Sequence, residues 1–286
     1  YGIGQAPAVR HIPLGVEPSF FPAPEDKNAL AHVARGRLGL GGELIFLVFA
    51  RISYQSKMDL LPILRAFKRA ESQGLAPGSY RLVLAGWPDK DDHFGPDIPK
   101  LAKNLGIKCT LVPRPYDTTR KELYAAAGVF LSPSDNLQET FGLTMLEAAV
   151  SGLPVIASDF DGYKDLVLNE ETGLLVSTYG PDDTPGTDAS GVILPASEYH
   201  LFLAQQCAVD VNEMGAAMAR LGKDQPLREA MGRAGWERAL TYSWDNIVKR
   251  YLALWEELNN TACDLDVPPG ERPRHRVFHP MYPPYM

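Results

Sequence analysis

Apolar residues along the chain follow two alternating patterns, short unbroken runs and longer stretches with helical spacing. Residues 44–50 form an unbroken apolar run, which is typical of a strand buried on both faces. Residues 58–72 then place apolar side chains three and four apart, the spacing of an amphipathic helix. Read in this way, the chain is predicted to form strands at 44–50, 80–85, 108–112, 129–132, 155–157 and 173–176. The predicted helices are 27–38, 58–72, 98–105, 118–127, 140–151, 162–168, 198–206, 212–221, 227–240 and 243–258.

Alternation of this kind predicts an α/β fold. Strands that alternate with helices build right-handed βαβ units, which join into a doubly wound parallel sheet with helices on both faces. The last helices follow the final predicted strand, so they are expected to be C-terminal additions to that sheet. Ligands of such sheets lie beyond the carboxyl ends of the strands, and candidate chemistry is therefore sought in the loops that follow strands.

Three segments depart from the alternation and suggest the domain limits. Residues 1–24 hold five prolines and are predicted to be an extended leading segment, with a possible edge strand at 9–13. Residues 177–195, rich in Gly, Pro, Asp, Thr and Ser, are expected to be an inserted loop, either a mobile surface loop or a functional flap. Residues 261–286 form a tail of prolines and aromatics, either a docking segment or disordered. The main domain then covers residues 25–260.

Composition excludes several classes of protein. The 286 residues carry 28 basic and 35 acidic side chains, a net charge of −7, which argues against a nucleic-acid partner. No stretch approaches the ~20 apolar residues of a transmembrane helix. The three cysteines are far apart and form no CxxC pair, so we expect free thiols in a reducing, cytoplasmic setting.

The loops also lack several well-known motifs. No G-x-G-x-x-G follows the run at 44–50, which removes the main support for a nicotinamide-dependent dehydrogenase. P-loop, G-x-S-x-G and H-E-x-x-H motifs are absent as well. The acidic stretch 89–97 is interrupted by Gly and Pro, and the histidines show no ligand spacing, so no metal site is expected.

Two cations follow the first strand of the predicted sheet. Arg51 ends the apolar run and Lys57 begins the next predicted helix. Arginine grips a phosphate with two parallel hydrogen bonds, and lysine acts on it as a point charge. In an acidic protein this pair suggests an anionic ligand, although two solvated surface charges would give the same pattern.

A sharper signal lies around residue 140, at the start of another predicted helix. Glu139 stands before that helix and Glu147 on its second turn, about 10–12 Å apart at ~1.5 Å per residue. Between them the helix N-terminus offers backbone N–H groups that favour phosphate. This span suits a sugar, a diphosphate and a ribose in a row. A helix-cap role for Glu139 and a solvent-facing Glu147 are the plainer alternatives, but the apolar neighbours of Glu147 require a partner for its carboxylate.

These residues resemble the family 4 glycosyltransferases of the GT-B fold. The resemblance rests on Glu139 and Glu147, seven residues apart within ETFGLTMLEA, and on SGLPVIAS at 151–158. Residues 12–16 and 173–176 and the Arg51–Lys57 pair also fit, so the match covers roughly residues 10–260. One departure is DGYKD at 161–165, where many members have Gly-Gly-x-Pro-Glu, and this leaves the contacts of that loop open.

The resemblance implies a Rossmann-like domain that binds a UDP-, GDP- or ADP-sugar. Carried over residue by residue, Glu139 contacts the sugar hydroxyls and Glu147 those of the ribose. Lys57 and Arg51 hold the diphosphate and stabilise the leaving charge. The remaining donor-binding positions implied are Phe141, Gly142, Leu143 and Thr144, with Arg114 and Tyr116 near the base.

The resemblance further implies retaining transfer, with no obligatory metal or other cofactor. A GT-B enzyme also has an N-terminal acceptor domain, for which this chain has no room, so we expect the donor half alone, weak or inactive by itself. A non-catalytic sugar-nucleotide-binding module or subunit is an open alternative. Another GT-B enzyme, such as a sugar-nucleotide epimerase or a phosphorylase, is a third. The base, sugar, acceptor and oligomeric state stay open.

Overall fold

The structure is a computed structural model that describes residues 9–263 except 55, 89–94, 137–138 and 184. It contains two compact units. One is Pro13–Trp244, and the other combines Tyr1–Ile12 with Asp245–Met286. The boundaries between the two units fall after Ile12 and after Trp244, whereas the sequence predicted domain limits at residues 24 and 260. Of the predicted tail, residues 264–286 lie outside the described residues.

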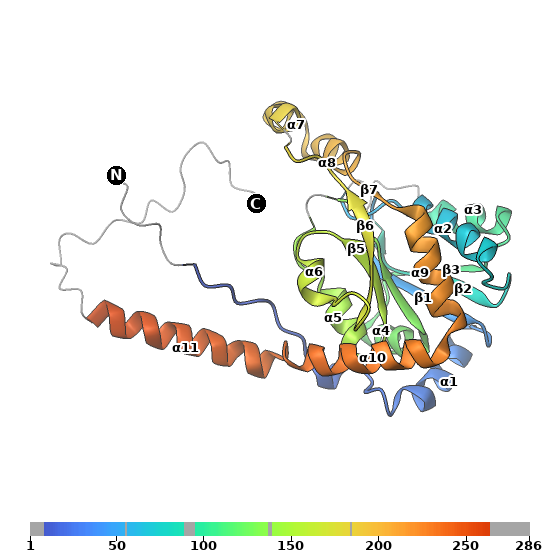
Figure 1. Cartoon of the computed structure of the whole chain (residues 1–286), viewed down its shortest axis with the longest axis horizontal. Coiled ribbons are helices and arrows are strands. Elements are labelled where there is room, and N and C mark those ends of the chain that lie inside the picture. Colours follow the sequence, from blue (N-terminus) through green and yellow to red (C-terminus); the bar gives the residue numbers. More distant parts are fainter. Residues whose placement is uncertain (1–8, 55, 89–94, 137–138, 184, 264–286) are drawn as a thin grey trace. The chain divides into compact units, whose positions relative to one another are not determined.

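The larger unit is built on a seven-stranded sheet of order β3-β2-β1-β4-β5-β6-β7 (Figure 1). The first six strands are parallel, and β7 pairs with β6 in the antiparallel sense. This order confirms the predicted doubly wound α/β sheet. The strands are β1 Leu44–Ile52, β2 Tyr80–Pro88, β3 Cys109–Pro113, β4 Val129–Ser132, β5 Val155–Asp159, β6 Gly173–Tyr179 and β7 Ala208–Val209.

Helices cover both faces of the sheet. Helices α2, α3 and α9 bury one face, while α1, α4, α5 and α6 bury the other (Figure 1). Helix α10 contributes Met231 to the first core and Ala239 to the second. The helices are α1 Lys27–Arg37, α2 Leu61–Ser72, α3 Ile98–Asn104, α4 Asp117–Ala126, α5 Leu143–Val150, α6 Tyr163–Leu166, α7 Pro185–Ser190, α8 Ala196–Ala204, α9 Val211–Lys223, α10 Gln225–Leu240 and α11 Trp244–Cys263. Short 3-10 helices lie at Pro18–Phe20 and Gly95–Asp97.

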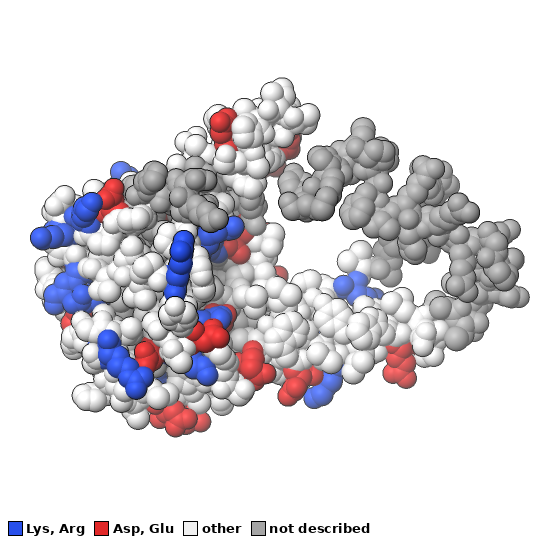
Figure 2. Space-filling model, turned by 180° about the vertical axis from the view of Figure 1, so that it is seen from behind, with Lys and Arg blue, Asp and Glu red and all other residues white. Residues whose placement is uncertain are grey.

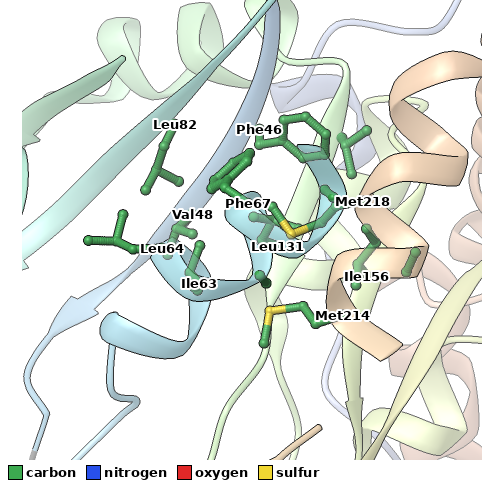
Figure 3. Close-up of a cluster of buried hydrophobic side chains, with 14 of the residues drawn as sticks. Phe46, Val48, Ile63, Leu64, Phe67, Leu82, Leu131, Ile156, Met214 and Met218 are labelled. Carbon is green, nitrogen blue, oxygen red and sulfur yellow. The ribbon is translucent and has the colours of Figure 1, made fainter. Parts of the chain in front are cut away.

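The core under α2 and α9 shows why the central strands read as unbroken apolar runs. Both faces of β1 are covered, and Phe46 on it packs edge-on against Phe67 of α2 with ring centroids 5.3 Å apart (Figure 3). Gly215 lets α9 approach closely, since a Cβ there would lie 2.5 Å from the Cβ of Arg69 on α2. Full burial of each large apolar side chain stabilises the fold by about 1.5–3 kcal/mol.

Several predicted boundaries are wrong, with clear local causes. The helix predicted from residue 58 begins at Leu61, because the amides of Lys57 and Met58 both donate to the carbonyl of Ser53 and close a turn first. The helix predicted from 140 begins at Leu143, because Gly142 has a positive φ of 92°. Residues 177–195 are not a plain loop, since β6 runs on to Tyr179 and α7 forms within them. The suggested edge strand at 9–13 does not form.

Candidate functional site

The candidate residues gather at the carboxyl edge of the sheet, between β1 and β4. These strands are neighbours in the sheet, but the chain leaves β1 toward β2 on one side and β4 toward β5 on the other. This is the topological switch point, where ligands of doubly wound sheets bind. The loops after β1, β4 and β5 all reach this point, which explains how residues 57, 139 and 163 meet.

Lys57, Glu139 and Tyr163 make a three-way contact there. The Lys57 ammonium pairs with the Glu139 carboxylate and donates a hydrogen bond to the Tyr163 hydroxyl at 3.0 Å. Ser132, the last residue of β4, donates to the same hydroxyl at 3.1 Å. Burial by itself lowers the pKa of Lys57, but Tyr163 and Glu139 more than offset it and hold that pKa above its usual value. The lysine is therefore a fixed positive charge.

Serine hydrogen bonds and one glycine fix the loops that carry these groups. Ser134 donates to the carbonyl of Lys57 at 2.9 Å, and Ser158 of β5 donates to the carbonyl of Ser134 at 2.5 Å. Gly142 is the N-cap of α5 in the left-handed region, and a Cβ there would lie 2.7 Å from the Tyr163 ring. Gly142 therefore lets α6 come close, so the start of α5 packs against the same Tyr163 ring that Lys57 contacts.

The other predicted diphosphate cation lies further out. Arg51 is exposed, and its guanidinium donates to the carbonyl of Ser56 at 3.1 Å, which ties down the loop that carries Lys57. The structure thus brings together Lys57, Glu139 and Gly142, whereas Arg51 stays at the margin. Leu143 is exposed, and Phe141 and Thr144 are half-buried around the same helix start.

The predicted base loop follows β3. Arg114 is exposed at a φ of +50°, and its amide donates to the carbonyl of Gly86 at 2.6 Å. Tyr116 is exposed and stands at the N-cap of α4. Both side chains are free of the core, and their suggested contact with a base remains a prediction.

Glu147 is buried, so the solvent-facing alternative for it is wrong. Its carboxylate pairs with Arg120 and accepts a hydrogen bond from the Tyr124 hydroxyl at 2.8 Å. Burial raises the pKa of Glu147, against the opposing effects of Arg120 and Tyr124. The Arg120 guanidinium lies within 5.6 Å of the ring centres of Phe20, Phe21 and Phe49. The carboxylate thus has the partner that its apolar helix requires, and its predicted ribose contact is untested.

Sequence reasoning missed Tyr163, Arg120 and Asp135. Tyr163 stands in the DGYKD segment, where the departure from the family pattern was itself the available signal. Asp135 is buried and accepts a hydrogen bond from the Asp59 amide at 3.0 Å, and burial raises the pKa of its carboxyl to about 7. The polar residues Ser134 and Asp135, close behind a buried strand, were the signal there. Nothing in the sequence around Arg120 distinguishes it from an ordinary surface arginine, so a single sequence could not have identified it.

Basic and acidic side chains are mixed on one face of the molecule, the face that Figure 2 displays. Within the described ranges no three His, Cys, Asp or Glu side chains cluster as a metal ion requires. No helix in the part of the chain that the structure describes has the length and apolar character to cross a membrane.

With this geometry in view, the family can be stated. Residues 33–184, more than half of the chain, match the family described as Glycosyl transferases group 1. The chain belongs to this family. The predicted resemblance to the GT-B glycosyltransferases is therefore confirmed.

Individual relatives agree with this membership. The chain is 36% identical over 167 residues to the D-inositol 3-phosphate glycosyltransferase of Rhodococcus erythropolis, covering 57% of this chain and 36% of that protein. It is 32% identical over 189 residues to the alpha-monoglucosyldiacylglycerol synthase of Streptococcus pneumoniae, covering 64% of this chain and 40% of that protein. The chain thus spans less than half the length of these two curated relatives.

Solved structures share the fold. Sucrose-phosphate synthase from Thermosynechococcus elongatus superposes with a TM-score of 0.62 at 25% identity, over 91% of this chain and 55% of that one. Anabaena HepE, solved with UDP and glucose, gives a TM-score of 0.60 at 17% identity, over 86% of this chain and 55% of that one. The likeness to HepE concerns the fold alone.

Proposed function

We propose that this chain is the donor-binding half of a retaining glycosyltransferase that uses a nucleotide-diphosphate sugar. The observation that carries the proposal is the contact of Lys57 with Glu139 and Tyr163, set beside the N-terminus of α5 at the switch point of the sheet. A fixed cation and a helix N-terminus suit a phosphate, and a carboxylate beside them suits the hydroxyls of a sugar on the same ligand. Membership of the glycosyltransferase family supports the same assignment.

The diphosphate is assigned to Lys57 and the first amides of α5. Leu143 and Thr144 stand in the first turn of this helix, whose N-cap Gly142 contributes no side-chain cap. Their N–H groups and the helix dipole favour an anion. When the sugar leaves, negative charge grows on the diphosphate, and a cation already in place stabilises that charge without rearrangement. Arg51 adds charge from the margin, and no metal has a role in this proposal.

Glu139 is assigned to the sugar. In the free protein its carboxylate holds the Lys57 ammonium in position, so both groups are ordered before the ligand arrives. When the diphosphate takes over the ammonium, the carboxylate oxygens become acceptors for sugar hydroxyls. Substitution of Glu139 with Gln is then expected to impair sugar transfer more than nucleotide binding.

The nucleoside end is assigned to α4 and α5. Glu147 already accepts from Arg120 and Tyr124, but each carboxylate oxygen has a second lone pair that can accept from a ribose hydroxyl. Arg114 and Tyr116, both exposed beyond β3, are assigned to the base. The acceptor is assigned to a separate N-terminal domain, in keeping with relatives more than twice as long as the matched segment.

Calorimetry of the chain with UDP-, GDP- and ADP-glucose tests this proposal. We expect one of the three to bind, and Lys57→Met to weaken that binding roughly tenfold or more, as loss of a charged phosphate contact requires. Lys103→Met is the matched control, because Lys103 is exposed on α3 and distant from the switch point. Absence of binding by all three donors, or equal affinity in Lys57→Met and the parent, contradicts the proposal.

A transfer assay then separates the alternatives. The assay uses the longer protein that contains both halves, with product analysis of the sugar. Transfer with retained anomeric configuration supports the proposal, whereas binding without turnover indicates a sensor or subunit. A changed sugar epimer released without an acceptor indicates an epimerase.

A further inference from the structure

A hollow lies at the amino edge of the sheet, opposite the edge that carries Lys57. Its volume is about 550 Å³. Leu44 at the start of β1 lines it, as do Gly128 and Pro154, which directly precede β4 and β5. Residues of α1, from both its first and last turns, and the N-terminal part of α10 form other walls. The hollow is therefore separate from the proposed donor site and lies entirely within the larger unit.

Cations outnumber carboxylates around this hollow. Its lining includes Lys27 and three arginines, namely Arg35, Arg228 and Arg233. Among the residues that the structure describes, none of these four has a carboxylate partner within 4 Å. The two lining carboxylates are engaged elsewhere, because Glu43 pairs with Arg81 and Glu229 accepts from Gln225 at 2.8 Å.

Backbone carbonyls hold two of these cations, Arg35 and Arg228, in place. Arg35 donates to the carbonyls of Gly41, Glu43 and Ala126 at 2.7–2.9 Å. Arg228 donates to the carbonyl of Leu221 at 2.5 Å. These carbonyls fix the two guanidinium charges at the walls, while Glu43 acts on Arg35, and Glu229 and Asp224 on Arg228, through space and without a direct ion pair.

Lys27 is poorly satisfied although it is partly buried. Its ammonium has one long hydrogen bond, to the carbonyl of Gly152 at 3.4 Å. Helix α10 packs closely against that carbonyl, because a Cβ on Gly232 would lie only 2.3 Å from its oxygen. Burial, with Arg228 and Arg35 nearby, lowers the pKa of Lys27 to about 7. An anion in the hollow would relieve this repulsion and restore the charged form.

We propose that this hollow is a second ligand site, which binds the phosphate group of a small organic phosphate. The volume exceeds that of a bare phosphate and lies in the range of small-molecule sites. The amide side chains of Asn28 and Gln225 also line it and suit hydroxyls next to the phosphate. A free phosphorylated metabolite and a phospholipid headgroup present the same chemistry to these residues.

Calorimetry with inorganic phosphate and glycerol 3-phosphate tests the site, in a Lys57→Met background that removes the contribution of the donor site. Because Lys57 does not line this hollow, the two proposals succeed or fail separately, and thermal denaturation checks that the Lys57→Met background is folded. We expect glycerol 3-phosphate to bind, and Lys27→Met to weaken it roughly tenfold. Arg233→Ala, at an exposed position that folding tolerates, should weaken it several-fold, Lys27→Arg should retain it, and Lys103→Met should leave it unchanged.

Sedimentation with vesicles identifies the source of the phosphate. Binding to phosphatidylglycerol vesicles but not to phosphatidylcholine vesicles, lost in Lys27→Met, indicates a headgroup. Binding of glycerol 3-phosphate without vesicle binding indicates a free metabolite. The proposal is overturned if neither glycerol 3-phosphate nor phosphatidylglycerol vesicles bind the Lys57→Met protein. It is also overturned if adding Lys27→Met and adding Arg233→Ala to that protein both leave its affinity for glycerol 3-phosphate unchanged.

Discussion

At the scale of single residues, two ion pairs of the larger unit hold largely buried charges. Lys57 and Glu139 satisfy each other at the switch point, and Arg120 and Glu147 do so beneath α5. Breaking such a pair on one side leaves the other charge buried and uncompensated, which is more harmful than replacing both. Asp135, by contrast, accepts a hydrogen bond from a backbone amide, and no cation among the residues that the structure describes pairs with it.

Glu147→Ala is predicted to destabilise the fold by about 2–4 kcal/mol, because Arg120 then lies among aromatic rings without its counter-ion. Replacing both residues with Met should recover most of that loss. Urea denaturation measures both effects, with the exposed Glu237→Ala as a control that changes stability by less than about 0.5 kcal/mol. A Glu147→Ala protein as stable as the parent would refute the structural role of the pair.

Asp135 should make stability depend on pH. Burial raises the pKa of its carboxyl from 3.8 to about 7 in the folded state, so the folded chain holds a proton that the unfolded chain has lost. Its contribution is therefore complete below pH 3.8 and is lost as the pH rises to about 7. Asp135→Asn should match the parent near pH 4 and exceed it by about 2–4 kcal/mol at pH 8. Urea denaturation at both pH values checks this, and a constant difference would contradict it.

At the scale of elements, the start of α5 determines the site. Gly142 adopts a positive φ, and its missing side chain leaves room for the Tyr163 ring of α6. The sequence predicted Gly142 and the helix but placed the start of the helix three residues too early. The spacing of apolar residues carries no information about the left-handed backbone of Gly142. It also missed β7, since two residues are too few to show an alternation.

Gly142→Ala is predicted to lose more stability than the strain of a positive φ alone, because the new methyl would press on Tyr163 and Met145. Gly106→Ala is the matched control, with a φ of +74° and nothing within 4 Å of the added Cβ. We expect a loss of about 1 kcal/mol for the control and roughly twice that for Gly142→Ala, together with weaker donor binding. Equal losses by thermal denaturation, with unchanged donor affinity, would show that the close approach is unimportant.

At the scale of the whole molecule, the sheet order gathers residues that are distant in sequence. The doubly wound class followed from the alternating patterns, because buried parallel strands must be apolar on both faces, whereas the strand order came from the structure. The partners of each charge did not follow: nothing in one sequence says that Arg120 meets Glu147, or that Tyr163 meets Lys57. Such pairings depend on which loops the strand order makes adjacent.

Stability should be unevenly distributed over this architecture. Strands β1 and β4 lie at the centre of the sheet with nearly all their residues buried, whereas Leu203 is the one described residue of α8 that is buried. We predict that amides of α7 and α8 exchange with solvent orders of magnitude faster than those of β1 and β4. Hydrogen exchange followed by mass spectrometry tests this, and comparable protection in both regions would contradict it.

The position of a bound diphosphate tests the central claim most directly. A crystal structure of the chain with UDP should show the diphosphate between the Lys57 ammonium and the amides of Leu143 and Thr144, with Glu139 no longer paired to Lys57. A diphosphate bound elsewhere, or a Lys57–Glu139 pair that persists with the ligand in place, would contradict the account.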